Sequence, residues 1–179
     1  MQKLTSQELS RLTVEDFKKA PKTPIYVILD NVRSLNNIGS VFRTCDAFAI
    51  KKLLLCGITA TPPHKDINRT ALGATESVLW EHYPTTAHAI DSLKKEGVKI
   101  IAVEQVKDSI SLETFSPAID TEYALVFGNE VFGVEQEVVD MCDMALEVPQ
   151  EGTKHSLNIA VCAGVVLWDL YAKIKYHNK

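Results

Sequence analysis

Three clusters of polar side chains stand where predicted strands end, and their residue types could bind and orient a polar ligand. The first contains Asn37 and Arg43, the second is the run 128–130 (GNE), and the third is the run 150–158 (QEGTKHSLN). In α/β proteins, ligands bind at the carboxyl ends of the strands. Each cluster taken alone also has a purely structural interpretation, because such residues turn the chain, cap helices or are solvated.

The sequence on either side of the first cluster predicts the strand and the helix that position it. The apolar run 26–29 (YVIL) has the length and β-branched content of a buried strand. Apolar residues then recur with helical spacing from Ile38 to Phe48, and Arg43 lies off that stripe. A strand, a polar loop and a helix that carries one arginine are therefore predicted.

Similar alternation continues along the chain. Further strands are predicted at 52–57, 78–83, 99–104, 123–127 and 145–148, and further helices at 86–96, 134–141 and 156–175. The Pro-rich segment 59–69 is predicted to be a loop, and 70–75 a tight connection. Six short apolar runs that alternate with helices indicate an α/β fold, with a largely parallel sheet covered by helices on both faces.

Composition bounds the class of protein. The 179 residues fit one domain, with 46% hydrophobic and 23% charged residues. The net charge of −4 lacks the general basic field of a non-specific nucleic-acid binder. The cysteines form no cluster with metal-ligand spacing, so no metal is expected and buried thiols in a reducing compartment are favoured: Cys45, Cys56, Cys142 and Cys162.

The two ends of the chain carry further signals. Residues 1–23 are predicted to form a helical arm, with capping-box spacing at Thr5 and Glu8, ahead of a single domain at 24–179. No signal-peptide core is seen, and the apolar segment 159–168 is too short to span a bilayer, so a cytoplasmic protein without a membrane partner is expected. The segment 159–170 is apolar nearly all round, which favours burial inside the domain or against a second subunit.

The three clusters together form ordered motifs at 37–48 (NIGSVFRTCDAF), 128–133 (GNEVFG) and 156–161 (SLNIAV). They resemble the motifs of the SpoU (TrmH-like) family of RNA ribose 2′-O-methyltransferases, in the SPOUT superfamily, whose approximate forms are NxGxxxRTADAFG, GxExxG and SLNxxxA. The resemblance covers roughly residues 24–171. Cys45 stands where alanine is usual and Ala49 where glycine is usual, and neither departure removes a functional side chain.

The resemblance implies a SPOUT fold, whose C-terminal part is threaded as a deep trefoil knot, an exception to the near-absence of knots. It also implies a homodimer. The methyl donor, S-adenosylmethionine, would lie bent in the knot and be held largely by backbone groups. Carried over by position, the cofactor-binding residues are Ala102, Val103, Glu104, Gly128, Asn129, Val148 and Leu157.

The implied reaction is attack by a ribose 2′-hydroxyl on the methyl carbon, with the reacting atoms held roughly 3–3.5 Å apart. In the family, the arginine at the position of Arg43 is placed at the hydroxyl and proposed as the base. A guanidinium has a pKa above about 12, so orienting the hydroxyl, binding the adjacent phosphate and stabilising the developing alkoxide is the easier role to defend. The resemblance implies that the remaining catalytic residues fix Arg43 and the substrate backbone: Asn37, Glu130, Ser156 and Asn158. Glu130 is expected to pair with Arg43 through a hydrogen bond.

The RNA substrate remains open at this point, with tRNA favoured over rRNA. The acidic composition requires a local basic groove, completed by a dimer, and its candidate contacts are Lys18, Lys19, Lys22, Arg33, Lys65, Arg69 and Lys154. One alternative is a non-catalytic RNA-binding relative that keeps the fold but not the reaction. Another is a dinucleotide-binding α/β domain, which is poorly supported because no GxGxxG follows the first strand.

Overall fold

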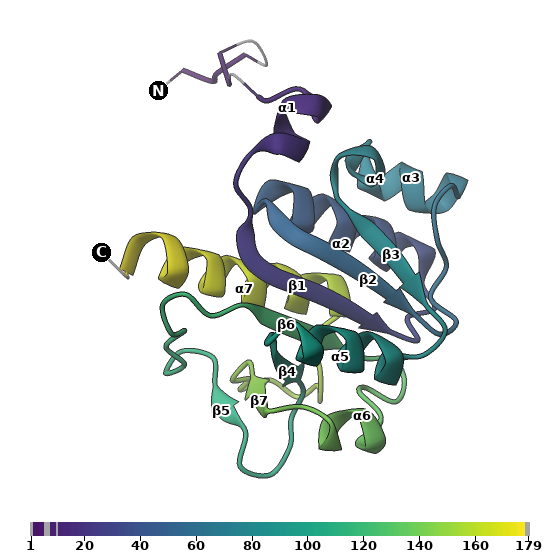
Figure 1. Cartoon of the computed structure of the whole chain (residues 1–179), viewed down its shortest axis with the longest axis vertical. Helices are drawn as coiled ribbons and strands as arrows, with labels where there is room; N and C mark the ends of the chain where they lie inside the picture. The colour runs from purple at the N-terminus through teal and green to yellow at the C-terminus, as the bar shows by residue number, and fades with distance from the viewer. Residues whose placement is uncertain (1, 6–7, 10, 178–179) are drawn as a thin grey trace.

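One seven-stranded sheet runs through the molecule in the strand order β3-β2-β1-β6-β4-β7-β5 (Figure 1). The structure is a computed structural model and describes residues 2–5, 8–9 and 11–177. The strands are β1 (Thr23–Asp30), β2 (Ile50–Cys56), β3 (Trp80–Tyr83), β4 (Lys99–Val103), β5 (Ile110–Ser111), β6 (Tyr123–Phe127) and β7 (Met144–Glu147). All the pairings in this sheet are parallel, which confirms the predicted architecture.

Helices cover both faces of the sheet. In chain order they are α1 (Val14–Lys19), α2 (Leu35–Ala47), α3 (Lys65–Ala71), α4 (Ala74–Ser77), α5 (Thr86–Lys95), α6 (Gln136–Asp140) and α7 (Ile159–Ala172), followed by a π-helical turn at Lys173–His177. Helix α2 packs against α3 and α7 on one face, and α5 packs on the other. Parallel strands are joined by such crossover helices, so neither face is left to solvent.

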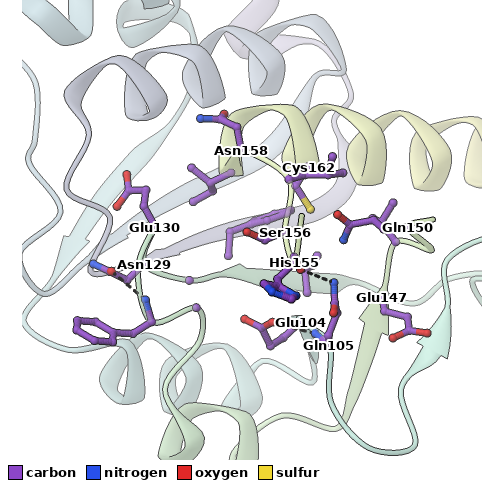
Figure 2. A pocket seen from close by; sticks show the side chains of 18 of the residues that line it. Glu104, Gln105, Asn129, Glu130, Glu147, Gln150, His155, Ser156, Asn158 and Cys162 are labelled. Atoms are coloured by element: carbon purple, nitrogen blue, oxygen red, sulfur yellow. Dashed lines mark hydrogen bonds between the residues drawn. The ribbon is translucent and has the colours of Figure 1, made fainter. Parts of the chain in front are cut away.

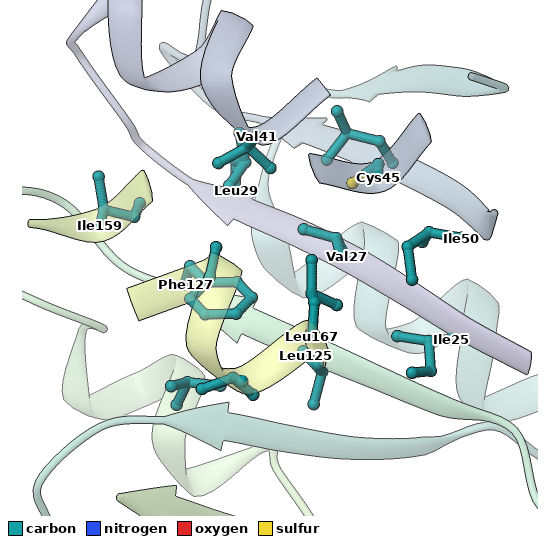
Figure 3. Close-up of a cluster of buried hydrophobic side chains, with 14 of the residues drawn as sticks. Ile25, Val27, Leu29, Val41, Cys45, Ile50, Leu125, Phe127, Ile159 and Leu167 are labelled. Atoms are coloured by element: carbon teal, nitrogen blue, oxygen red, sulfur yellow. The ribbon is translucent and has the colours of Figure 1, made fainter. Parts of the chain in front are cut away.

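Strand β1 shows how the sequence builds this core. Ile25, Val27 and Leu29 point into the cluster shared with α2 and α7, whereas Tyr26 and Ile28 point into the cluster shared with α5 and α6. Successive side chains alternate between the faces of a strand, and here both faces are buried. The strand therefore reads as a continuous apolar run, and Figure 3 shows the larger of its two clusters.

Helix α2 begins at Leu35, three residues before the predicted start. The Ser34 side chain accepts a hydrogen bond from the backbone N–H of Asn37 at 3.3 Å and so caps the helix. The apolar stripe that starts at Ile38 is buried as predicted. Because the helix begins early, Asn37 lies inside its first turn, next to the loop that follows β1.

Three elements were not predicted, one of which is the four-residue helix α4, which begins within the connection expected at 70–75. Helix α3 forms within and beyond the predicted loop 59–69, where His64 caps it and only Ile67 and Ala71 are buried. Two apolar positions in a short polar segment after Pro62 and Pro63 leave no periodic signal. Strand β5 has only two residues and lies at the sheet edge, so it is too short for a pattern.

The N-terminal helix lies later than predicted. The Thr5–Glu8 capping box forms its hydrogen bonds, since Glu8 Oε2 accepts from the backbone N–H of Thr5 at 2.7 Å. Helix α1, however, begins at Val14, where the Thr13 side chain accepts from the N–H of Asp16 at 3.1 Å. Residues 1, 6, 7 and 10 of the predicted arm lie outside the described residues. A second capping signal thus starts the helix.

Helix α7 is buried along one side only. Its inward side chains are Ile159, Ala163, Val166, Leu167 and Leu170. Val161, Val165 and Trp168 are exposed on the opposite side, so the expected burial all round does not occur within one protomer. Among the helices that the structure describes, none has both the length and the apolar character to cross a bilayer.

Candidate active site

A pocket of about 490 Å³ opens at the carboxyl ends of β4, β6 and β7 (Figure 2). Its volume lies within the roughly 300–1,000 Å³ typical of small-molecule sites. The structure brings most of the predicted site residues together here: Val103, Glu104, Gly128, Asn129, Glu130, Val148, Ser156, Leu157 and Asn158. Ala102 does not line the pocket, because it is fully buried one residue earlier in β4.

Several further residues line the pocket without having been predicted. The polar ones are Gln105, Glu147, Gln150 and His155, together with the thiol of Cys162. Most of them directly neighbour predicted residues at strand ends, so extending each predicted cluster by one or two positions would have found them. Gln105 Nε2 donates to the carbonyl oxygen of His155 at 3.0 Å, which ties the loop after β4 to the loop before α7. Burial raises the pKa of Cys162 to about 11, so this thiol stays protonated and is a poor nucleophile near neutral pH.

A chain of hydrogen bonds joins the three sequence motifs. Glu130 Oε1 accepts from the backbone N–H of Ser34 at 2.9 Å and from the side-chain amide of Asn37 at 3.2 Å. Glu130 Oε2 accepts from the N–H of Arg33 at 3.1 Å. Asn158 Nδ2 donates to Asn37 Oδ1 at 3.2 Å, and Asn158 Oδ1 caps α7 by accepting from the N–H of Ala160 at 2.9 Å. Asn37 therefore sits between the other two motifs and fixes their relative positions.

These bonds also control the ionisation of Glu130. Partial burial acts to raise the pKa of Glu130, but the backbone N–H groups of Arg33 and Ser34 and the amide of Asn37 outweigh it, so the pKa lies below its ordinary value. No hydrogen bond joins Glu130 to Arg43 among the described residues, so within one protomer the expected pair is replaced by bonds to the loop after β1.

We expect Glu130→Gln to lower the free energy of unfolding at pH 7, because an amide accepts these bonds less strongly than a carboxylate. A lowered folded-state pKa means that Glu130 contributes stability above its unfolded pKa, about 4.3. That contribution is lost as the pH falls through the folded-state pKa. Denaturant midpoints of the two proteins should therefore differ at pH 7 and converge in acid. A gap that stayed constant down to the lowest pH would contradict this.

The turn after β6 is held rigidly at the pocket edge. Asn129 and Gly133 exchange two backbone hydrogen bonds, each of 2.9 Å, and Asn129 Nδ2 donates to the carbonyl oxygen of Asn31 at 2.8 Å. Glu104 Oε2 accepts from the N–H of Val134 at 3.0 Å. Gly128 begins this turn, and its Cα lies very close to the backbone at the other end of the turn. A Cβ at Gly128 would lie 2.1 Å from the carbonyl carbon of Gly133.

Arg43 lies in a second hollow, apart from the pocket. Its side chain is exposed on α2, six residues or about 9 Å along the helix axis from Asn37. Arg69 from α3 and Gly164 from α7 also line this hollow. No hydrogen bond or ion pair holds the Arg43 guanidinium among the described residues, whereas Arg69 Nη2 donates to Asn36 Oδ1 at 2.9 Å. The Arg43 side chain is therefore free to meet a group from outside its protomer.

Of the predicted basic contacts, Lys22 lies against α1 and apart from Arg33 and Arg69. Arg33 and Arg69 lie beside motif one, through the Arg33 backbone bond to Glu130 and the Arg69 bond to Asn36. Lys22 instead folds back on α1, where its ammonium lies 3.3 Å from the centre of the Phe17 ring.

The chemistry of the pocket can be tested against the expected donor. Its floor is apolar, through Val103, Phe127 and Leu146, as an adenine ring requires. Its rim carries the carboxylates of Glu104, Glu130 and Glu147, and none of the residues that the structure places around it is a lysine or arginine. S-adenosylmethionine carries a sulfonium and an ammonium against one carboxylate, so an acidic rim matches its net positive charge. The residues present fit this donor.

Comparisons with known proteins agree with these features. The chain is 28% identical over 165 residues to a tRNA (guanosine(18)-2′-O)-methyltransferase of Thermus thermophilus, covering 90% of this chain and 81% of that protein. It is also 28% identical over 155 residues to a 23S rRNA (guanosine-2′-O-)-methyltransferase of Coxiella burnetii, covering 86% of this chain and 60% of that protein.

The fold has solved counterparts as well. An AdoMet-bound rRNA methyltransferase from Sinorhizobium meliloti matches with a TM-score of 0.77 and 26% identity, over 86% of this chain and 59% of that chain. This chain thus spans only about 60% of the rRNA-modifying proteins that it matches. The model of the SpoU rRNA methylase family matches residues 24–168, so the chain belongs to the SpoU family.

Proposed function

We propose that this protein transfers a methyl group from S-adenosylmethionine to a ribose 2′-hydroxyl of RNA. The observation that carries the proposal is the hydrogen-bond chain from Glu130 through Asn37 to Asn158. It holds the three family motifs together at the rim of a pocket whose charge fits the donor. The names of the relatives from Thermus and Coxiella agree with ribose methylation of RNA.

The chain's own residues have three tasks in this reaction. When bound, S-adenosylmethionine supplies an electrophilic methyl group. The pocket is lined by the rim carboxylates, by Val103, Gly128 and Val148, and by Leu157, and these groups would hold the donor. Arg43 would bind the phosphate next to the target ribose, orient the hydroxyl and stabilise the alkoxide that develops on it, while the hydroxyl proton passes to solvent water and the demethylated donor leaves as a neutral thioether. Ser156, which is exposed at the rim, contacts the substrate backbone.

We favour tRNA as the substrate. The chain covers 81% of the Thermus tRNA enzyme but only 60% of the Coxiella rRNA enzyme. Within this chain, RNA recognition would involve residues 24–179 as the catalytic domain, the arm 1–23, and a second copy of the chain.

The position of Arg43 and the surface of α7 support a homodimer. Val161, Val165 and Trp168 form an exposed apolar stripe at helical spacing, with exposed fractions of 54%, 41% and 54%. The hollow of Arg43 borders this stripe at Gly164. Pairing of two α7 stripes would bury them and bring Arg43 of each protomer toward the pocket of the other.

We expect Val165→Glu to convert the dimer to a monomer, because a charge in the centre of an apolar interface is desolvated without a partner. Light scattering should change from twice the chain mass to 19.9 kDa. Leu79→Glu is the matched control, since Leu79 is also an exposed apolar residue but lies before β3, away from α7. A wild-type protein that is monomeric at every concentration would exclude the dimer.

The C-terminal trefoil knot is part of the same proposal. In the sheet, β6 lies between β1 and β4, and β7 lies beyond β4. The chain after β7 then returns to the first motif, where Asn158 bonds to Asn37. These crossings support a threaded C-terminus. An experimental structure whose chain forms no knot would contradict it.

The four cysteines are unpaired, which supports a reducing compartment such as the cytoplasm.

The direct test is methyl transfer from labelled S-adenosylmethionine to total tRNA and, separately, to rRNA, followed by nucleoside mapping. A 2′-O-methylated nucleoside at one tRNA position would establish the reaction and its address. Label in rRNA alone would keep the reaction and overturn the preference for tRNA. Donor binding without transfer to either RNA would favour the non-catalytic RNA-binding alternative.

A further inference from the structure

Phe132 is the most exposed large hydrophobic side chain of the part of the chain that the structure describes, with 80% of its surface accessible. It lies on the turn between β6 and α6 and lines the pocket together with its neighbour Val131. Burying a phenylalanine side chain normally stabilises a fold, and here that stabilisation is forgone. A fold with an apolar core directly behind this turn leaves the ring outside.

The exposure does not result from a loose turn. Asn129 Oδ1 accepts from the backbone N–H of Val131 at 2.9 Å and from that of Phe132 at 3.4 Å. The paired backbone bonds between Asn129 and Gly133 close the same turn. Val134, two residues after Phe132, is buried in the cluster under α6. Both ends of the turn are anchored, so the backbone presents the ring at a defined place.

The position of the Phe132 ring relative to the motifs limits which ligand group it can contact. Glu130, two residues before Phe132, holds the loop after β1 and the Asn37 amide. A ligand that reached this part of the rim would therefore meet the ring and the motif residues at once. The ring has no polar atom, so it can offer only an apolar surface and a π face.

We propose that Phe132 stacks on the base of the nucleotide whose ribose is methylated, an inference that rests on the proposed function. Single-stranded RNA is commonly held by aromatic side chains on which splayed bases stack. A base within a duplex has neighbours on both faces, so the target must be an unpaired or extruded nucleotide. Because stacking reads the π face and not the base edge, Phe132 selects for strandedness and little for base identity.

The test compares Phe132→Ala, Phe132→Tyr and Phe132→Leu in methyl transfer and in binding of a single-stranded RNA oligonucleotide that carries 2-aminopurine at the target position. Loss of one base–aromatic stacking contact should lower the kcat/KM of the alanine variant for RNA about 5- to 150-fold. Tyrosine should restore the value, and leucine, which is apolar but has no π face, should not. Binding should quench 2-aminopurine fluorescence in the wild type and much less in the alanine variant.

Two controls separate stacking from other roles. Ile119→Ala removes a side chain that is 69% exposed in another loop and should change neither RNA binding nor turnover. Donor affinity and the oligomeric mass of Phe132→Ala should equal those of the wild type. An alanine variant with wild-type kcat/KM, or one in which leucine restores as well as tyrosine, would overturn the stacking role.

The outcome also distinguishes this inference from the proposed function. If the wild type methylates RNA and Phe132→Ala does so equally well, only the stacking role fails. If the wild type binds the oligonucleotide with quenching that depends on Phe132 but transfers no methyl group, the proposed reaction fails while the base contact stands. A loss of donor affinity in Phe132→Ala would place the ring against the donor and contradict the inference.

Discussion

In an Arg43→Ala variant, kcat is expected to fall about 10²- to 10³-fold. This is the usual effect of removing one hydrogen-bond donor that stabilises a developing oxyanion. Its free energy of unfolding should change by less than about 0.5 kcal/mol, because surface substitutions without partners are nearly neutral. Arg43 is exposed and has no hydrogen-bond or ion-pair partner among the described residues. Single-turnover methyl transfer at saturating donor would measure the loss.

Two further variants give this experiment its controls. Arg69→Ala removes the same charge from the same hollow. Because the Arg69 guanidinium is bonded to Asn36, kcat should stay close to that of the wild type, and the loss of an RNA contact would change only KM. Arg43→Lys keeps the charge but loses the planar fork of donors, so it should restore only part of the rate. A fully active Arg43→Ala enzyme would remove Arg43 from the mechanism.

A Gly128→Ala variant is expected to lose donor affinity by tenfold or more, a change of about 1.4 kcal/mol. The new Cβ would lie 2.1 Å from the carbonyl carbon of Gly133 and 2.2 Å from the backbone nitrogen of Val134. Both atoms belong to the backbone of the turn, so the turn itself must shift. Overpacking of this kind typically costs about 1–3 kcal/mol in the free energy of unfolding.

The turn that must move is the one that carries Glu130, so the damage should reach the junction of the motifs as well as the donor pocket. Calorimetry with S-adenosylmethionine and denaturant unfolding would measure the two effects separately. Gly152→Ala is the matched control, because a Cβ at Gly152 meets nothing within 4 Å and its φ is not in the left-handed region. Wild-type affinity and stability in Gly128→Ala would show that the turn yields without cost.

Much of this protein could be predicted from the sequence by itself. The runs at 26–29 and 123–127 are apolar without a break, because the strands that they form are buried on both faces. The stripe that begins at Ile38 is buried along α2, as its spacing predicted. The three ordered motifs indicated the family, and the family model confirms it. The local spacing of apolar residues predicts which side chains are buried, and the ordered motifs indicate the family.

Only the tertiary structure decided which residues form hydrogen bonds with one another in the site. Glu130 bonds to the backbone of Arg33 and Ser34, which lie nearly a hundred residues earlier, and not to Arg43. A carboxylate takes whichever donors the fold brings to it, and that depends on β6 lying beside β1 in the sheet. The same long-range order buries Ala102, a predicted site residue, and leaves Phe132 exposed, although both residues are apolar and Phe132 lies within the motif 128–133. Periodicity measures burial along one segment, whereas the site is made by contacts between segments.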